Sequence, residues 1–265
     1  MDETERLDGA ALFATQVLAI AGAEVRKLHH DPLELLTRAI QPILWLLLFG
    51  RVMGNVRGLD TGNIPYVDFL TAGVLAQSVL FVAIFYGISA IWERDLGVLQ
   101  RYLVSPAPRV ALVAGKAISA AIRGLSQAAI VYLLAIVEGT PLNFAVANLA
   151  GVVCLISLGA ALFATLSLAI ACLVKTRERF MGIGQVLTMP IFFASNAIYP
   201  LALMPSWLRA VAIVNPLTYE VDALRALMIP GATTSFGLPL DFAVLIATTA
   251  ALFTLAARLY PRMGV

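Results

Sequence analysis

Long apolar stretches separated by short charged segments dominate the pattern of this chain. A membrane-spanning helix needs about 20 apolar residues, because hydrocarbon cannot satisfy backbone groups that are not helical. Stretches of this kind recur, and residues 69–92 and 144–174 contain no charged residue at all. The pattern predicts an all-α integral membrane protein with six transmembrane helices. The expected spans are about 35–54, 67–92, 110–137, 144–174, 181–199 and 236–257.

Three segments between or before these spans have a different pattern. Residues 10–23 are apolar but too short to span, and charged residues follow them, so an amphipathic helix at the membrane interface is expected at about 8–30. Charges and paired prolines place residues 93–109 outside the bilayer. Residues 200–229 mix apolar and helix-breaking residues, which predicts short outer or re-entrant helices. With no internal repeat or linker, residues 1–265 are expected to form one domain.

Composition supports a membrane location. The chain is 60% hydrophobic and only 13% charged, whereas soluble domains are about 45–50% apolar and about 25% charged. Its mean hydropathy is +0.90. The excess apolar area must therefore face lipid. The formal net charge of +2 is too small to indicate a nucleic-acid partner.

The distribution of Lys and Arg predicts the topology. If both termini are cytoplasmic, thirteen of these residues fall in cytoplasmic segments, and three fall outside: Arg57, Arg209 and Arg225. Arg51 and Arg123 lie in or near the bilayer. Because cytoplasmic loops carry the excess of positive charge, this bias favours an even number of spans and places residues 93–109 in the cytoplasm.

Motifs for energy conversion or catalysis are missing from the sequence. The Gly115-Lys116 pair lacks the glycine loop and hydroxyl residue of a nucleotide-binding P-loop. The predicted spans hold no chain of Asp, Glu or His of the kind that proton-driven pumps use. Cys154 and Cys172 have no neighbouring metal ligands, and His29 and His30 are expected at the interface and not on a metal. We therefore expect no catalytic residue, no metal site and no ATP binding on this chain.

The segment from Glu93 to Lys116 has a specific pattern. It reads Glu-Arg-Asp-x-Gly-x-Leu, then Leu-x-Ser-Pro, then Gly-Lys just inside the next span. This resembles the ABC-2 type permeases, the membrane subunits of bacterial drug, lipid and polysaccharide exporters. Asp95 and Val98 stand where that family often has Glu and Thr. Further matches are Gln41-Pro-Ile-Leu-Trp45, Tyr199-Pro200, Leu203-Met-Pro-Ser-Trp-Leu208, Asn215-Pro-Leu-Thr-Tyr219 and Asp222-Ala-Leu-Arg225.

The resemblance implies the permease subunit of an ABC exporter in a bacterial or archaeal plasma (inner) membrane. Such a subunit is not an enzyme; it moves an amphiphilic drug or lipid, and ATP and Mg are bound by a partner ATPase present in two copies. A second permease subunit would complete a homodimer or heterodimer. Export of polysaccharide or lipo-oligosaccharide is the alternative within the family. A secondary transporter is disfavoured because embedded carboxylates and an inverted repeat are missing.

The resemblance also implies that residues 93–105 form a cytoplasmic coupling helix seated in a cleft of the ATPase. Such a helix, joined rigidly to two spans, can convert closure of the ATPase into tilting of the spans. The alternative is a solvated loop whose charges only fix the topology. The predicted coupling residues are Glu93, Arg94, Asp95, Leu96, Gly97, Leu99, Tyr102 and Leu103.

Other residues are candidates for a substrate path. Arg123 lies about two turns into its span, where an unpaired charge is costly. It either meets an anionic headgroup or forms a structural pair with Glu93 or helix carbonyls. Pro190 is expected near the middle of its helix, as a gating kink or a packed bend. Six aromatic residues line a path or simply pack: Phe81, Phe85, Tyr86, Phe192, Phe193 and Tyr199. An outer motif is implied to cap and orient the re-entrant helices: Asn215, Pro216, Tyr219, Asp222 and Arg225.

Overall fold

The protein is helical throughout the part of the chain that the structure describes. This computed structural model describes residues 15, 22, 32–56, 61, 64–97, 109–174 and 176–260, and these contain no strand. The predicted interfacial helix at 8–30 therefore lies almost entirely outside the described residues. Four helical segments are long and apolar enough to cross a membrane: Tyr66–Asp95, Leu112–Glu138, Val146–Leu173 and Leu238–Leu259.

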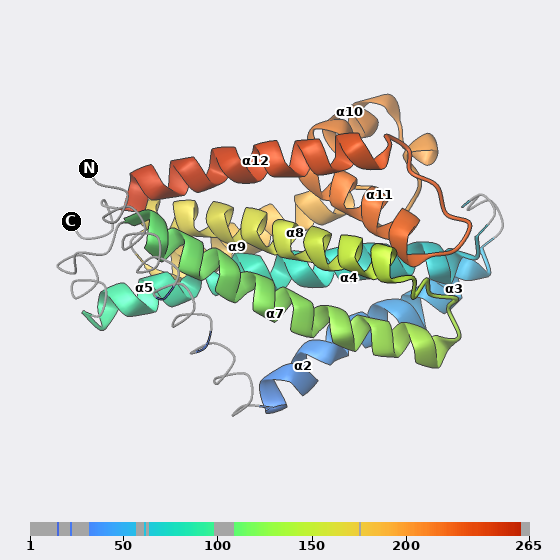
Figure 1. Ribbon diagram of the computed structural model, residues 1–265, viewed down its shortest axis with the longest axis horizontal. Coiled ribbons are helices and arrows are strands. Elements are labelled where there is room, and N and C mark those ends of the chain that lie inside the picture. The colour runs from blue at the N-terminus through green and yellow to red at the C-terminus, as the bar shows by residue number, and fades with distance from the viewer. Residues whose placement is uncertain are drawn as a thin grey trace.

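Four long helices run along the long axis of the molecule (Figure 1). They are α4 (Tyr66–Tyr86), α7 (Arg109–Glu138), α8 (Val146–Leu173) and α12 (Leu238–Leu259). α8 has no charged residue and packs against each of the other three. The shortest of α7, α8 and α12 has 22 residues and extends about 33 Å, so each of the three is long enough to cross a hydrocarbon layer of about 30 Å.

A short helix continues α4 beyond Gly87 and marks one end of the bundle. This helix is α5 (Ile88–Asp95), and we call this end the α5 end. Apolar residues from five helices form one cluster there, which shows that the start of α7 and the ends of α8 and α12 meet at α5. The cluster contains Ala90, Ile91, Leu112, Val113, Leu168, Ala169, Ala171, Cys172, Phe180, Ala256 and Tyr260.

Small residues allow the long helices to approach closely. Within lipid there is little hydrophobic drive between helices, so close packing of small residues takes its place. Gly124 of α7 faces Ala160 and Ile156 of α8, where an added Cβ would lie 3.2 Å from the Ala160 Cβ. Gly73 of α4 faces the backbone of Ala197, and no side chain fits there.

The first predicted span is a helix that changes from α-helical to π-helical hydrogen bonding along its length. It consists of α2 (Pro32–Ile43), the π-helix η1 (Leu44–Gly50) and α3 (Arg51–Gly54). Pro42 lacks an N–H and cannot make the regular helical hydrogen bond, and the π-helix follows directly. At its far end, Arg51 Nη2 lies 3.0 Å from Glu138 Oε2 at the end of α7.

The fifth predicted span is shorter than expected. The helix is α9 (Arg177–Phe193), not 181–199. The Asn215 side chain explains its end, because its Nδ2 donates to the carbonyls of Ile191 at 2.7 Å and Ala194 at 2.9 Å. Pro190 consequently lies in the last turn, and the prediction of a proline near the middle of this helix is wrong.

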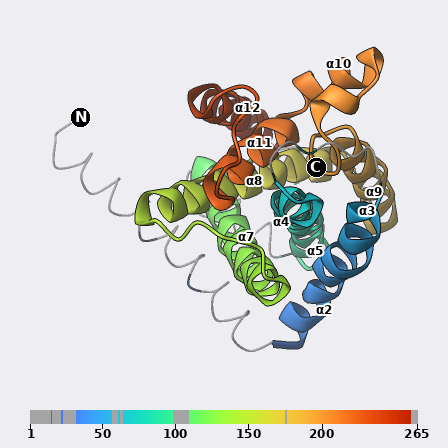
Figure 2. The same cartoon turned by 90° about the vertical axis from the view of Figure 1, so that its right-hand side faces the viewer.

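Short helices occupy the region between α9 and α12, where no full-length span was expected. They are η2 (Leu201–Leu203), α10 (Ser206–Val214) and α11 (Pro216–Met228). α10 lies at the edge of the molecule (Figure 2). α11 is buried over most of its length and packs against α4, α8 and α12. It therefore belongs to the core, although it is too short to span the bilayer.

Candidate functional site

The end of α5 is bound to α7 by an ion pair. Glu93 Oε1 lies 2.9 Å from Lys116 Nζ. The helix then stops at Asp95, and Gly97 follows with a φ of 71°. A glycine in this left-handed conformation is a common helix terminator. The predicted helix over 93–105 does not begin at Glu93, because residues 93–95 are the last residues of α5. The predicted coupling residues Leu99, Tyr102 and Leu103 lie outside the described residues.

A second set of contacts joins α5 to the turn between α8 and α9. Asp95 Oδ2 lies 2.8 Å from Arg177 Nη2, and Arg94 Nη1 donates to the Val174 carbonyl at 3.2 Å. The Arg177 guanidinium carbon also lies 3.6 Å from the centre of the Trp92 ring, a cation–π distance. We call Trp92, Arg94, Asp95, Val174 and Arg177 the α5 clasp. Together with the Glu93 pair, it attaches α5 to three other helices.

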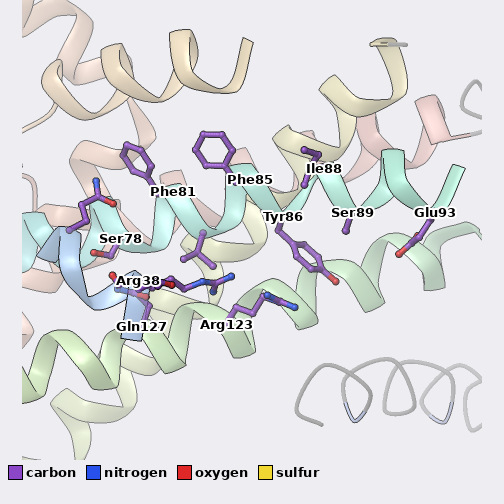
Figure 3. Close-up of a pocket in the computed structure, with 13 residues that line it drawn as sticks. Arg38, Ser78, Phe81, Phe85, Tyr86, Ile88, Ser89, Glu93, Arg123 and Gln127 are labelled. Atoms are coloured by element: carbon purple, nitrogen blue, oxygen red, sulfur yellow. The ribbon is translucent and has the colours of Figure 1, made fainter. Parts of the chain in front are cut away.

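A cavity of about 410 Å³ lies between α2, α4, α5 and α7. We call it the inner cavity (Figure 3). It brings together four predicted path residues, Phe81, Phe85, Tyr86 and Arg123, and one predicted coupling residue, Glu93. Its other lining residues are Thr37, Arg38, Gln41, Ser78, Val82, Ile88, Ser89 and Gln127. Aromatic and aliphatic residues share the lining with polar and charged ones, so the cavity is amphiphilic.

Arg123 lies beside an aromatic ring in this cavity. Its guanidinium carbon is 5.2 Å from the centre of the Tyr86 ring. The Lys116 ammonium lies 5.8 Å from the same ring. Glu93, one of the structural partners predicted for Arg123, forms its ion pair with Lys116 instead. Figure 3 shows Arg38 and Arg123 extending between α4 and α7 in the direction of Glu93.

Gln127 connects the cavity to the proline in α2. Pro42 frees the carbonyl of Arg38, four residues earlier, and Gln127 Nε2 donates to that carbonyl at 3.2 Å. The Gln127 side chain is only 2% exposed. Its Oε1 receives no hydrogen bond within the part of the chain that the structure describes. The amide nitrogen of Gln127 therefore links α7 to α2 at the cavity.

The predictions missed Arg38 and Gln127 as cavity residues. Helical spacing could have found Gln127, because Lys116, Arg123 and Gln127 follow one another at intervals of seven and four and share one face of α7. Arg38 gave no such signal, because its approach to α7 depends on how α2 crosses the bundle. A tertiary contact of this kind is not visible in a local pattern.

The remaining path candidates do not line this cavity. Pro190 lines a separate apolar groove of about 530 Å³ between α9 and α10. Phe192 is fully buried, and its ring centre lies 5.3 Å from the Trp45 ring, which indicates packing. The Tyr199 hydroxyl donates to the Phe193 carbonyl. The six predicted aromatic residues thus lie in at least two separate places.

Part of the outer motif connects α10 to α11. Asn215 caps α11, since its Oδ1 accepts from the Leu217 N–H at 3.0 Å. Pro216 is the first residue of α11, where the missing N–H is tolerated. The Tyr219 hydroxyl donates to the Ile213 carbonyl at 2.7 Å.

The other two motif residues hold α11 in the core. Asp222 accepts from the Ser235 N–H at 2.6 Å and from the Asn196 amide at 3.4 Å. Arg225 donates to the carbonyls of Asn196 at 2.7 Å and Phe69 at 3.2 Å. Buried charges are tolerable when they are hydrogen-bonded in this way. The motif therefore joins α11 to α4 and to the segment before α12.

Four long apolar helices, two of which line an amphiphilic cavity, define a multi-pass helical membrane protein. The ABC-2 type transporter family model matches residues 15–229, and the chain belongs to this family. The family supplies membrane components of transporters that work with an ABC ATPase, and such a component is not itself an enzyme. This confirms the family resemblance that the motifs indicated.

Several curated proteins are similar to the chain. The putative transport permease ycf38 of Porphyra purpurea is 28% identical over 228 residues, covering 83% of this chain and 77% of that protein. The daunorubicin resistance ABC transporter permease protein DrrB1 of Streptomyces coeruleorubidus is 24% identical, covering 75% of this chain and 70% of that protein. Nodulation protein J of Rhizobium leguminosarum bv. trifolii is 25% identical, with 74% of each covered.

Proposed function

We propose that this chain is the permease subunit of an ABC exporter that moves an amphiphilic drug or lipid out of the cytoplasm or the inner leaflet. ATP and Mg bind to a separate ATPase subunit. Two permease copies, or one copy with a related chain, act with two ATPase copies. Six spans with both termini in the cytoplasm, in a bacterial or archaeal plasma membrane, complete the proposal. The daunorubicin resistance named for the relative DrrB1 supports this cargo class.

The observation that carries the proposal is the attachment of α5. This helix follows α4 at the end of the bundle that the charge distribution assigns to the cytoplasm. Ion pairs hold it to α7 and α9, and a hydrogen bond holds it to the Val174 carbonyl at the end of α8. A movement of α5 that a partner causes is therefore transmitted to several helices at once, because packed helices move as units. The amphiphilic lining of the inner cavity supports an amphiphilic cargo.

Site-specific photocrosslinking tests the proposed partner. A photoreactive amino acid is introduced at Leu96, which is exposed at the α5 end, and as a matched control at Val146, which is exposed at the opposite end of the bundle. We expect a crosslink from position 96, but not from 146, to a polypeptide that carries a nucleotide-binding P-loop. No such crosslink in native membranes, or equal crosslinking from both positions, would contradict the proposal.

A further inference from the structure

We infer that Gly87, the joint between α4 and α5, is a hinge, and that bending there changes the shape of the inner cavity. Only the use of this bend for export rests on the proposed function; the bend itself does not. Three observations carry the inference: the hydrogen bonds around the joint, the division of the apolar core at the same level, and the position of the joint in the cavity lining.

The backbone hydrogen bonds change at the joint. The Gly87 N–H donates to the Ile84 carbonyl at 3.3 Å, and the Ala90 N–H donates to the Gly87 carbonyl at 3.1 Å. Each bond spans three residues, as in a 3₁₀-helix, whereas the bonds of an α-helix span four. A short stretch of this kind within a long helix often marks a hinge. The apolar segment Tyr66–Asp95 therefore consists of two helices that are joined at one residue.

The apolar core is divided at the level of the joint. Ile84 of α4 belongs to a large apolar cluster, whereas Ala90 of α5 belongs to the separate cluster at the α5 end. The residues of α8 are divided in the same way, since Ala164 lies in the first cluster and Leu168 in the second. Each cluster is close-packed and resists deformation. A bend at Gly87 follows this existing boundary and therefore disrupts neither cluster.

Ser167 of α8 supports the joint. It is buried at the boundary between the two clusters, and its Oγ donates to the Ile84 carbonyl. Hydroxyl groups of neighbouring helices satisfy carbonyls where a membrane helix is interrupted. An added Cβ at Gly87 would collide with the Ser167 side chain and would lie 3.0 Å from Phe180 Cζ. The glycine thus allows α8 to approach, and the unbroken α8 is the support against which the joint bends.

The inner cavity is lined from both sides of the joint. Phe85 and Tyr86 precede the joint on α4, and Ile88 and Ser89 follow it on α5 (Figure 3). The α5 residues are held by the Glu93 ion pair and the α5 clasp. A bend at the joint therefore shifts one part of the lining relative to the other. This links a movement of α5 to the size and shape of the cavity.

Distance measurements on the full-length chain in lipid nanodiscs test the hinge without any ATPase. Spin labels are attached in Val52→Cys/Leu96→Cys, at two positions that are exposed at opposite ends of the bundle. The natural cysteines are removed by Cys154→Ser and Cys172→Ser. Double electron–electron resonance then gives the distribution of distances between the two labels. If the joint bends, this distribution depends on the contacts that support the joint.

Replacement of Ser167 provides the comparison. Ser167→Ala removes the hydroxyl that holds the Ile84 carbonyl, so we expect the distance distribution to broaden or shift. Ser157→Ala is the matched control, because this hydroxyl of the same helix donates to the Val153 carbonyl at 2.7 Å. It lies ten residues, or about 15 Å, from Ser167 and should leave the distribution unchanged. A distribution that is unchanged in Ser167→Ala, or changed equally in both variants, overturns the inference.

A tether across the joint tests its role in export. In Phe85→Cys/Ile88→Cys, without the natural cysteines, a short bifunctional thiol reagent links the two positions across Gly87. A monofunctional reagent of the same size adds the same bulk without the link. With the partner ATPase present, the linked chain should lose ATP-driven transport at least about fivefold relative to the chain with the monofunctional reagent.

The outcomes separate the hinge from the export function. Equal transport after both reagents overturns the role of the bend in export. If the native complex transports no cargo, the exporter proposal fails, and the distance distribution of Ser167→Ala still decides whether the joint is a hinge.

Discussion

Glu220 is the most unusual single residue of the core. Its side chain is fully buried on α11 and packs against Gly159 of α8, where an added Cβ would collide with the Glu220 carboxyl group. Neither carboxyl oxygen receives a hydrogen bond within the described part of the chain. Asp222, two residues away, is equally buried but accepts hydrogen bonds from Ser235 and Asn196. The two carboxyl groups thus have opposite environments.

Burial raises the pKa of Glu220 well above its ordinary range, because the charged form is penalised by desolvation. The folded protein therefore binds this proton more tightly than the unfolded chain does. The contribution of Glu220 to the free energy of unfolding is complete at pH values below the pKa that this group has in the unfolded chain. The contribution decreases as the pH rises from there to the higher pKa of the folded protein.

Replacement of Glu220 by Gln should remove this loss of stability at high pH. Glu220→Gln has almost the same shape but cannot ionise, so we expect it to unfold a few degrees higher than the native chain at pH 8, with a smaller difference at pH 5. Thermal unfolding in detergent at both values measures this. Glu178→Gln, at an exposed carboxyl on α9, should have no effect. A Glu220→Gln gain that is the same at both pH values would show that ionisation is not the cause.

At the scale of elements, the α5 clasp is the connection that the proposed coupling depends on. Asp95 and Arg177 are each about one-third exposed, with 34% and 32% of their side chains accessible. An exposed ion pair of this kind contributes little to stability, because water screens the two charges. The pair therefore adds little to the stability of the fold, and its proposed role is to transmit movement.

A charge swap tests the clasp. Asp95→Arg places two cations together and should reduce ATP-driven transport at least about fivefold, the lower range of typical coupling energies. Combining it with Arg177→Asp should restore most of the activity, while thermal unfolding changes little. Glu178→Arg is the control, since it reverses a neighbouring exposed charge outside the clasp. If the double variant transports no better than Asp95→Arg, direct pairing is not what matters.

Apolar runs predicted the presence of the long helices well, but they predicted the helix ends less well. α4, α7, α8 and α12 follow directly from apolar runs bounded by charges or turn residues. The end of α9 depends on Asn215, which lies more than twenty residues later in the chain. Four of the predicted path residues, Phe81, Phe85, Tyr86 and Arg123, line the inner cavity, whereas Arg38 and Gln127 were not predicted there. Local patterns report periodicity and charge, but they do not report which distant side chain satisfies a carbonyl.

The whole molecule has two chemically different ends. The α5 end gathers Arg94, Lys116, Arg177 and Arg258 around one apolar cluster. The opposite end contains the Arg51–Glu138 ion pair. This asymmetry supports a cytoplasmic α5 end, because positive charge accumulates on the cytoplasmic side. With that orientation, the proposed ATPase contacts α5. The inner cavity lies beside α4, the span that leads to α5.

The central claim is that this chain conducts the cargo while a separate subunit hydrolyses ATP. Reconstitution into proteoliposomes tests it most directly, with the purified chain alone or together with the ABC ATPase that crosslinks to position 96, and with labelled phosphatidylglycerol and a hydrophobic drug as cargoes. We predict that the chain alone hydrolyses no ATP and moves no cargo, and that the two subunits together do both. Transport by the chain alone, driven by a proton gradient, would contradict this account.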